Sequence, residues 1–169
     1  MIMNNALNQA FRQAMRQMAG GVCVITVNDG EERTGLTATS VVSVSMDPPE
    51  LLISVNRSSS SWPVLEKAGR FGINVLNRAQ QQVAENFSGK GGLRGAARYA
   101  DDDWLQTPQG VWLSRKALTV FACDVEKVFQ HRQHALVIGK VAFIDVMPGP
   151  LPLTYWEGSY RTLSQASVA

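Results

Sequence analysis

The chain has 169 residues, of which 45% are apolar and 18% are charged, and its formal net charge at pH 7 is +2. This composition excludes a disordered chain and indicates one globular domain over residues 1–169. The basic residues are scattered, so we expect no nucleic-acid partner. The chain has no secretory pattern at its N-terminus and no apolar run of about 18 residues, so we expect no membrane partner and a cytoplasmic location.

The first part of the chain predicts a helix and then strands. Apolar side chains at helical spacing predict an amphipathic helix over residues 6–19, capped by Asn4 or Asn5 and ended by Gly20 and Gly21. β-Branched and alternating segments, separated by turn residues, predict the strands that follow. These strands cover residues 22–27, 33–46, 51–56 and 70–76.

Two short helices and a long loop come next. Pro63 suits the first turn of a helix that Gly69 ends, and Asn77 suits the cap of a helix over residues 78–87. Residues 88–103 are rich in glycine and have no apolar period, which predicts a mobile loop. The remaining strands are expected over residues 117–129, 134–146 and 153–158.

The order of these elements indicates the fold class. Strands outnumber helices and do not alternate with them regularly, which argues against a doubly wound parallel sheet. A mainly β fold, with a mostly antiparallel barrel and peripheral helices, fits better.

The two cysteines, Cys23 and Cys123, both lie in apolar, β-branched stretches. Buried free thiols are favoured over a disulfide, and we expect no metal site because no Cys/His cluster is present. The chain also lacks a GxGxxG motif after a strand, a Walker loop, a GxSxG motif and an HExxH motif. An enzyme with this sequence would therefore depend on a cofactor for its chemistry.

Three segments are candidates for binding, and each also has a structural interpretation. The small and hydroxylated residues 37–40 would let a planar ligand approach the backbone, although hydroxyls that simply face water on a strand are the favoured alternative. Residues 56–61 lie between a strand and a helix. Arg57 and the free amides at the helix start suit a phosphate, and the alternative is that the segment is a simple capped turn. His134 begins a strand, where it is either a ligand contact or a hydrogen-bonded histidine at the edge of the core.

The chain carries in order the segments FRQAM, GGVCVITV, GLTATSVVSVSMDPPELLISVNRSSSSWPVL, FGINVLNRAQQQVAENFSG, RYADDDW, HALVIGKV and LTYWEGSYRTL. The long third segment is the most specific, because a Thr-Ala-x-Ser stretch is followed by SVS, Asp-Pro-Pro and an apolar strand. Together, from about Phe11 to Leu163, these segments resemble the flavin reductase family of two-component monooxygenases. The resemblance implies the FMN-binding split β-barrel fold of that family.

The resemblance also implies which residues form the site. It places the isoalloxazine ring of a flavin at residues 37–40 and beside the end of the strand over residues 51–56. The ribityl phosphate lies near Ser60 and Ser61, and the loop that begins at Phe87 closes over the flavin. The cofactor-binding residues implied are Thr37, Ala38, Thr39, Ser40, Ser54, Val55, Asn56, Ser60, Ser61, Phe87, Ser88, Gly89, Arg98, Tyr160 and Arg161. His134 matches the histidine of the family's Gly-Asp-His motif on the nicotinamide side, but here Arg132 and Gln133 replace the Gly and Asp.

The activity implied is NAD(P)H:flavin oxidoreductase. Hydride passes from the nicotinamide C4 to N5 of FAD or FMN, with NADH favoured over NADPH by the resemblance, and the protein aligns the two rings. The reduced flavin then passes to a separate monooxygenase, and the family forms homodimers. The alternatives are a split-barrel oxidoreductase that retains its flavin and a non-catalytic flavin-binding protein.

Overall fold

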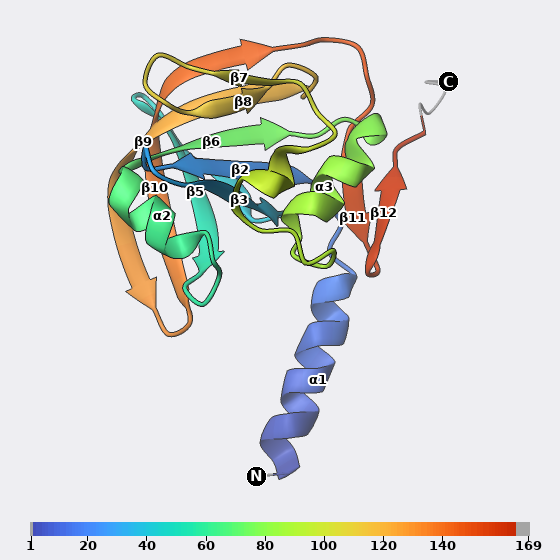
Figure 1. Cartoon of the computed structure of the whole chain (residues 1–169). Helices are drawn as coiled ribbons and strands as arrows, with labels where there is room; N and C mark the ends of the chain where they lie inside the picture. The colour runs from blue at the N-terminus through green and yellow to red at the C-terminus, as the bar shows by residue number, and fades with distance from the viewer. Residues whose placement is uncertain (1, 165–169) are drawn as a thin grey trace.

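The computed structural model describes residues 2–164 (Figure 1). Its helices are α1 (Ile2–Arg16), α2 (Trp62–Ala68) and α3 (Gln81–Phe87), with 3-10 turns η1 (Arg78–Gln80) and η2 (Gly95–Tyr99). Its strands are β1 (Gly20–Gly21), β2 (Cys23–Asn28), β3 (Arg33–Ala38), β4 (Val41–Met46), β5 (Pro49–Asn56), β6 (Arg70–Val75), β7 (Trp104–Gln106), β8 (Trp112–Ser114), β9 (Thr119–His131), β10 (His134–Val146), β11 (Leu153–Trp156) and β12 (Ser159–Thr162).

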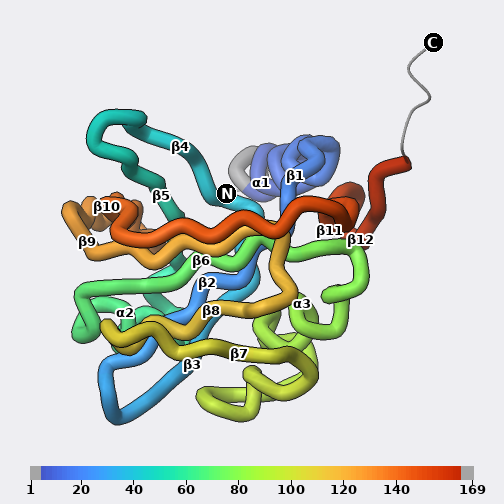
Figure 2. The backbone as a smooth tube through the Cα atoms, turned by 90° about the horizontal axis from the view of Figure 1, so that it is seen from above, coloured from blue at the N-terminus to red at the C-terminus, as the bar shows by residue number. Residues whose placement is uncertain are grey.

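One large antiparallel sheet dominates the molecule. Its strands run in the order β3-β2-β6-β9-β10-β5-β4, and two smaller sheets, β1-β11-β12 and β7-β8, flank it. Seen from above, β4 and β5 lie on one side of the molecule and β7 and β8 on the other (Figure 2). The expected mainly β, mostly antiparallel fold with peripheral helices is confirmed.

The two outer strands of this sheet, β3 and β4, follow one another in the chain but do not pair in the described residues. β3 pairs with β2, whereas β4 pairs with β5, and only Thr39 and Ser40 connect them. We call this opening the split. The single strand expected over residues 33–46 was therefore wrong, because its two halves join opposite edges of the sheet.

Apolar side chains fill the space inside the curved sheet. Phe71 and Ile73 of β6 are fully buried there, and α2 closes one end with Trp62 and Leu65. A second cluster lies under α3, where Phe87 packs against other buried side chains. Asn77 caps η1 with a complete capping box, as expected from the sequence, although η1 precedes α3 instead of being part of it.

The helix α1 extends away from the sheet (Figure 1). It begins at Ile2, so the expectation that Asn4 or Asn5 caps it was wrong, and it ends at Arg16 before Gly20–Gly21 pair as β1. Every side chain described from residue 5 to residue 19 is exposed. Its contacts with the β11–β12 hairpin include the Glu157 amide donating to the Arg16 carbonyl at 3.0 Å.

Both thiols lie in the core. Cys23 and Cys123 are free and buried, in agreement with the sequence-based interpretation. Desolvation by burial raises the pKa of each thiol to about 12, so both are protonated at neutral pH.

Candidate functional site

A cavity of about 210 Å³ lies at the split. Residues of β3 and of the turn after it form one wall, and the β11–β12 hairpin and the loop after α3 form the others. The lining residues are Val22, Thr37, Ala38, Thr39, Ser88, Lys90, Tyr155 and Tyr160. The small side chains of Thr37, Ala38 and Thr39 leave this space open next to β3.

The hydroxyls of Thr37, Thr39 and Ser40 at the split differ in their contacts with the protein. Thr37 Oγ1 donates to the Ala84 carbonyl at 2.6 Å, which ties β3 to α3. Ser40 Oγ donates to the Ser54 carbonyl at 3.3 Å, which ties the turn to β5. The Thr39 side chain is exposed and makes no hydrogen bond within residues 2–164. Thr39 is therefore the hydroxyl of this wall that a ligand can use without displacing a protein contact.

Two tyrosines form the opposite wall of the cavity. Tyr155 and Tyr160 pair across β11 and β12, with their ring centroids 5.3 Å apart in an edge-on arrangement. Desolvation by burial raises the pKa of Tyr160, so its hydroxyl is neutral at physiological pH. Both tyrosines and Lys90 also line a neighbouring groove of about 570 Å³ along α3. The cavity at the split is therefore continuous with a larger open surface.

A third hollow, of about 380 Å³, lies between the start of α2 and the glycine-rich loop. Its lining residues are Ser58, Ser60, Gly89, Gly92, Leu93, Arg94 and Arg98. Ser88 lines the cavity at the split and Gly89 lines this hollow, so the start of one loop borders both. We call this third space the arginine hollow.

Arg98 is held rigidly at the arginine hollow. Its side chain is 7% exposed, and its Nε donates to the Leu93 carbonyl at 3.0 Å. Its Nη2 donates to Ser60 Oγ at 3.3 Å, and its Nη1 donates to the Gly35 carbonyl of β3. Ser61 Oγ also donates to the Gly35 carbonyl, at 2.6 Å. β3, α2 and η2 are thus joined at one carbonyl.

The structure brings together many, but not all, of the residues expected from the sequence. Thr37, Ala38, Thr39, Ser88 and Tyr160 line the cavity at the split, and Ser60, Gly89 and Arg98 line the arginine hollow. Val55, Ser61 and Phe87 are buried in the interior, at 0%, 0% and 1% exposure, so they line neither hollow directly. Arg161 is exposed on β12.

His134 lies apart from these hollows. It is exposed at the start of β10, where it is opposite Asn56 of β5 and His131 of β9. The expected strand start is confirmed, and Arg132 in the turn before it has a positive φ of 49°. His134 lines neither the cavity at the split nor the arginine hollow.

Several lining residues were missed from the sequence, among them the polar side chains of Lys90, Arg94 and Tyr155. Lys90 and Arg94 lie in the glycine-rich loop, which has no period that would predict where its side chains point. Tyr155 was part of an expected strand, but its position opposite β3 depends on the pairing of β11 with β1.

A sequence profile of the family described as "Flavin reductase like domain" matches residues 15–164. The chain belongs to this family. It is 36% identical over 154 residues to "FMN reductase (NADH) RutF 2" of Methylorubrum extorquens, covering 91% of this chain and 88% of that one. It is 30% identical over 161 residues to "4-hydroxyphenylacetate 3-monooxygenase, reductase component" of Thermus thermophilus, covering 93% and 97%.

A solved structure of another flavin reductase has the same fold. The "Streptomyces globisporus C-1027 NADH:FAD oxidoreductase SgcE6 in complex with NAD and FAD fragments" superimposes with a TM-score of 0.85 at 25% identity, and the match covers 93% of each chain. This likeness extends over nearly the whole sheet and its peripheral elements.

The residues of this flavin reductase fit a flavin. The wall at the split has small side chains and an unused hydroxyl, which suit a planar ring with polar edges. The arginine hollow adds a buried guanidinium with no carboxylate within 4.0 Å among residues 2–164, which suits a phosphate. Among the same residues there is no group of His, Cys, Asp and Glu that would hold a metal ion, and no helix is long and apolar enough to cross a membrane.

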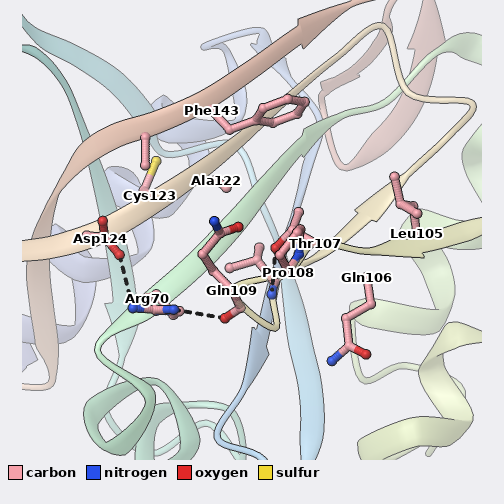
Figure 3. Close-up of a pocket in the computed structure, with 12 residues that line it drawn as sticks. Arg70, Leu105, Gln106, Thr107, Pro108, Gln109, Ala122, Cys123, Asp124 and Phe143 are labelled. Carbon is pink, nitrogen blue, oxygen red and sulfur yellow. Dashed lines mark hydrogen bonds and ion pairs between the residues drawn. The ribbon is translucent and has the colours of Figure 1, made fainter.

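One further hollow, of about 480 Å³, lies outside this site, against β6, β9 and β10 (Figure 3). Arg70 borders it and forms an ion pair with Asp124 at 3.6 Å, while its Nη1 donates to the Gln109 carbonyl at 2.9 Å. Its other lining side chains, such as Leu105 and Phe143, are mainly apolar. None of the residues expected from the sequence lies here.

Proposed function

We propose that this chain is an NAD(P)H:flavin oxidoreductase in which the flavin binds across the split with its phosphate in the arginine hollow. The observation that carries this proposal is the pair of hollows bordered by the same loop, one lined with small hydroxylated residues and one with a buried arginine. A bound flavin, FAD or FMN, would supply N5 as the acceptor of hydride from C4 of the nicotinamide.

The chain's own residues bind and orient the two reactants. Thr39 donates to or accepts from the edge of the ring, while Ala38 leaves room for the ring against β3. Tyr160 presents a neutral phenol at the opposite side of the cavity. No side chain is required to act as an acid or a base for hydride transfer, so alignment and exclusion of water are the main contributions of the protein.

Two features support NADH as the hydride donor and a separate monooxygenase as the acceptor of reduced flavin. The name of the relative from Methylorubrum extorquens includes NADH, and the relative from Thermus thermophilus is a monooxygenase reductase component. The open cavity at the split also suits a flavin that leaves after reduction. His134 is the proposed contact on the nicotinamide side.

We also propose that the chain is a single domain and forms a homodimer. The family match over residues 15–164 supports one domain. Leu7, Phe11 and Met15 of α1, with Met18 just after it, form an exposed apolar stripe. This stripe supports association with a second copy, because monomeric proteins rarely leave such a stripe in water.

A steady-state assay tests the reductase function. The full-length protein is mixed with NADH or NADPH, with and without added FMN or FAD, and the loss of reduced nicotinamide is followed. We expect repeated turnover that depends on the concentration of added flavin. Oxidation of NADH only when another electron acceptor is supplied would identify an enzyme that retains its flavin, and no oxidation under any condition would contradict the proposal.

A further inference from the structure

The arginine hollow contains a second arginine that the site described so far does not use. Arg94 precedes η2 and lines the hollow together with Arg98, which lies four residues later. Arg98 is buried, whereas Arg94 is exposed, so Arg98 forms the inner wall and Arg94 the rim. The exposed side chain of Arg94 and the buried guanidinium of Arg98 therefore border one space.

The charge of this hollow is not balanced by an acid. Neither arginine is within 4.0 Å of a carboxylate in residues 2–164. Burial and the charge of Arg94 both lower the pKa of Arg98, so the two cations are close enough to repel each other. The charge of Glu32 acts in the opposite direction on the pKa of Arg98, raising it, but Glu32 forms no ion pair with either arginine. An anion between the two arginines would relieve this repulsion.

The hydrogen-bond donors define which anion fits. Arg98 Nη2 already donates to Ser60 Oγ, and that hydroxyl is able to donate in turn to a ligand. The Ser58 side chain lines the same wall. Two guanidinium groups and a serine hydroxyl lining one hollow match a phosphate that has several free oxygens and more than one negative charge.

We propose that Arg94 is a specificity-determining residue that, with Arg98 and Ser60, binds the terminal phosphate monoester of FMN and makes the chain prefer FMN to FAD. The inference rests on the proposed function, which places the flavin phosphate in this hollow. A phosphate monoester near pH 7 carries a charge of about −1.5 to −2 and three free oxygens. In FAD the same phosphate is linked to a second one, so it keeps a single charge and loses one free oxygen.

Binding titrations test this assignment. The full-length protein, freed of flavin, is titrated with riboflavin, FMN and FAD while flavin fluorescence is followed. We expect R94A to weaken FMN binding about tenfold and to leave riboflavin binding within about twofold, because riboflavin has no phosphate. R94K, which keeps the charge but loses the planar fork, should restore part of the affinity. R78A removes an exposed arginine outside both hollows and is the matched control; it should change none of the three affinities.

Several results would overturn the assignment. Equal weakening of riboflavin and FMN would mean that Arg94 only shapes the loop. A larger loss for FAD than for FMN would place Arg94 against the second phosphate or the adenosine. A rise in the KM for NADPH, with unchanged KM for NADH and unchanged FMN binding, would assign Arg94 to the phosphate of the nicotinamide nucleotide. Arg94-dependent FMN binding without any NADH oxidation would instead support this inference and contradict the proposed function.

Discussion

At the scale of single residues, Thr39 is the most direct probe of the split. Its hydroxyl has no protein partner in the described residues, so Thr39→Val removes a ligand contact without removing a bond of the fold. We expect flavin binding to weaken by about 0.5–1.5 kcal/mol, the usual value of one hydrogen bond, with little change in stability. Flavin titration and thermal unfolding measure both. Thr162→Val, on an exposed residue of β12, is the control, and equal flavin affinity in both variants would contradict a role for Thr39.

His134 is the residue whose role depends most on its surroundings. If it contacts the nicotinamide, His134→Ala should raise the KM for NADH and leave flavin affinity close to that of the wild type. A decrease in kcat would indicate that the imidazole also aligns the rings. Because the side chain is exposed at the start of β10, its loss should have little effect on stability. A lower Tm together with weaker binding of both ligands would show a structural role instead.

The sequence predicted the residues at the split better than the polar residues around them. The short stretch 37–40 stands out because its side chains are small, and three of its residues, Thr37, Ala38 and Thr39, line the cavity. Arg94 carries no such signal, since a charged residue in a glycine-rich loop is ordinary. Its position beside Arg98 follows from η2, which the sequence did not predict.

At the scale of elements, Gly72 shows how closely β2, β6 and β8 are packed. A Cβ at this position would lie 2.3 Å from Thr26 Oγ1 and 2.9 Å from the Trp112 carbonyl. Gly72→Ala should therefore destabilise the fold by about 1–3 kcal/mol or more, because neither neighbour is the end of a flexible chain. Denaturant unfolding measures this change. Gly21→Ala is the control, since a methyl group added there would meet no atom within 4 Å, and equal stability of the two variants would refute the argument.

The glycine-rich segment contains two parts of different stability. Asp102 fixes the second part, because its carboxylate accepts hydrogen bonds from Ser114 Oγ at 2.6 Å and Gln80 Nε2 at 2.8 Å. Residues 88–94 have few such contacts. We expect fast amide exchange in residues 88–94 that slows when flavin binds, and slower exchange near Asp102 in both states. Hydrogen-exchange mass spectrometry tests this. Equal exchange of residues 88–94 with and without flavin would contradict closure of this segment over the ligand.

Local patterns explain which elements were predicted correctly. The long hairpin of β9 and β10 and the helix cap at Asn77 depend on near neighbours, so they could be read from the sequence. The break between β3 and β4 could not, because alternating small polar and apolar residues continue through it. That segment is divided because β3 pairs with β2 and β4 pairs with β5, and these partner strands lie outside the segment itself.

At the scale of the whole molecule, α1 indicates how two copies associate. Leu7 and Phe11 are 68% and 62% exposed on a helix that no other part of residues 2–164 covers. A charge in this stripe should oppose its burial in a dimer, so Phe11→Glu should shift the protein towards a monomer. Size-exclusion chromatography with light scattering measures the mass.

The opposite face of the same helix supplies the control. Gln13→Glu adds the same charge outside the apolar stripe and should leave the mass unchanged. A dimer that survives Phe11→Glu would mean that other surfaces, such as the exposed Phe143 and Ile144 of β10, hold the two copies together. A wild-type monomer would contradict the homodimer altogether.

The crowding around Gly72 has a counterpart at Gly35 and Gly139, and it affects how such a gene tolerates mutation. A Cβ would lie 2.3 Å from the Ile25 carbonyl at Gly35, and 2.5 Å from the Phe71 ring at Gly139. Every single-base missense change in a glycine codon encodes a residue with a Cβ. At these three codons, therefore, every single-base missense change causes the clash. At many surface codons, in contrast, a single-base change gives a residue that the fold tolerates. Random mutagenesis followed by selection for folded protein should leave these three codons almost without missense changes.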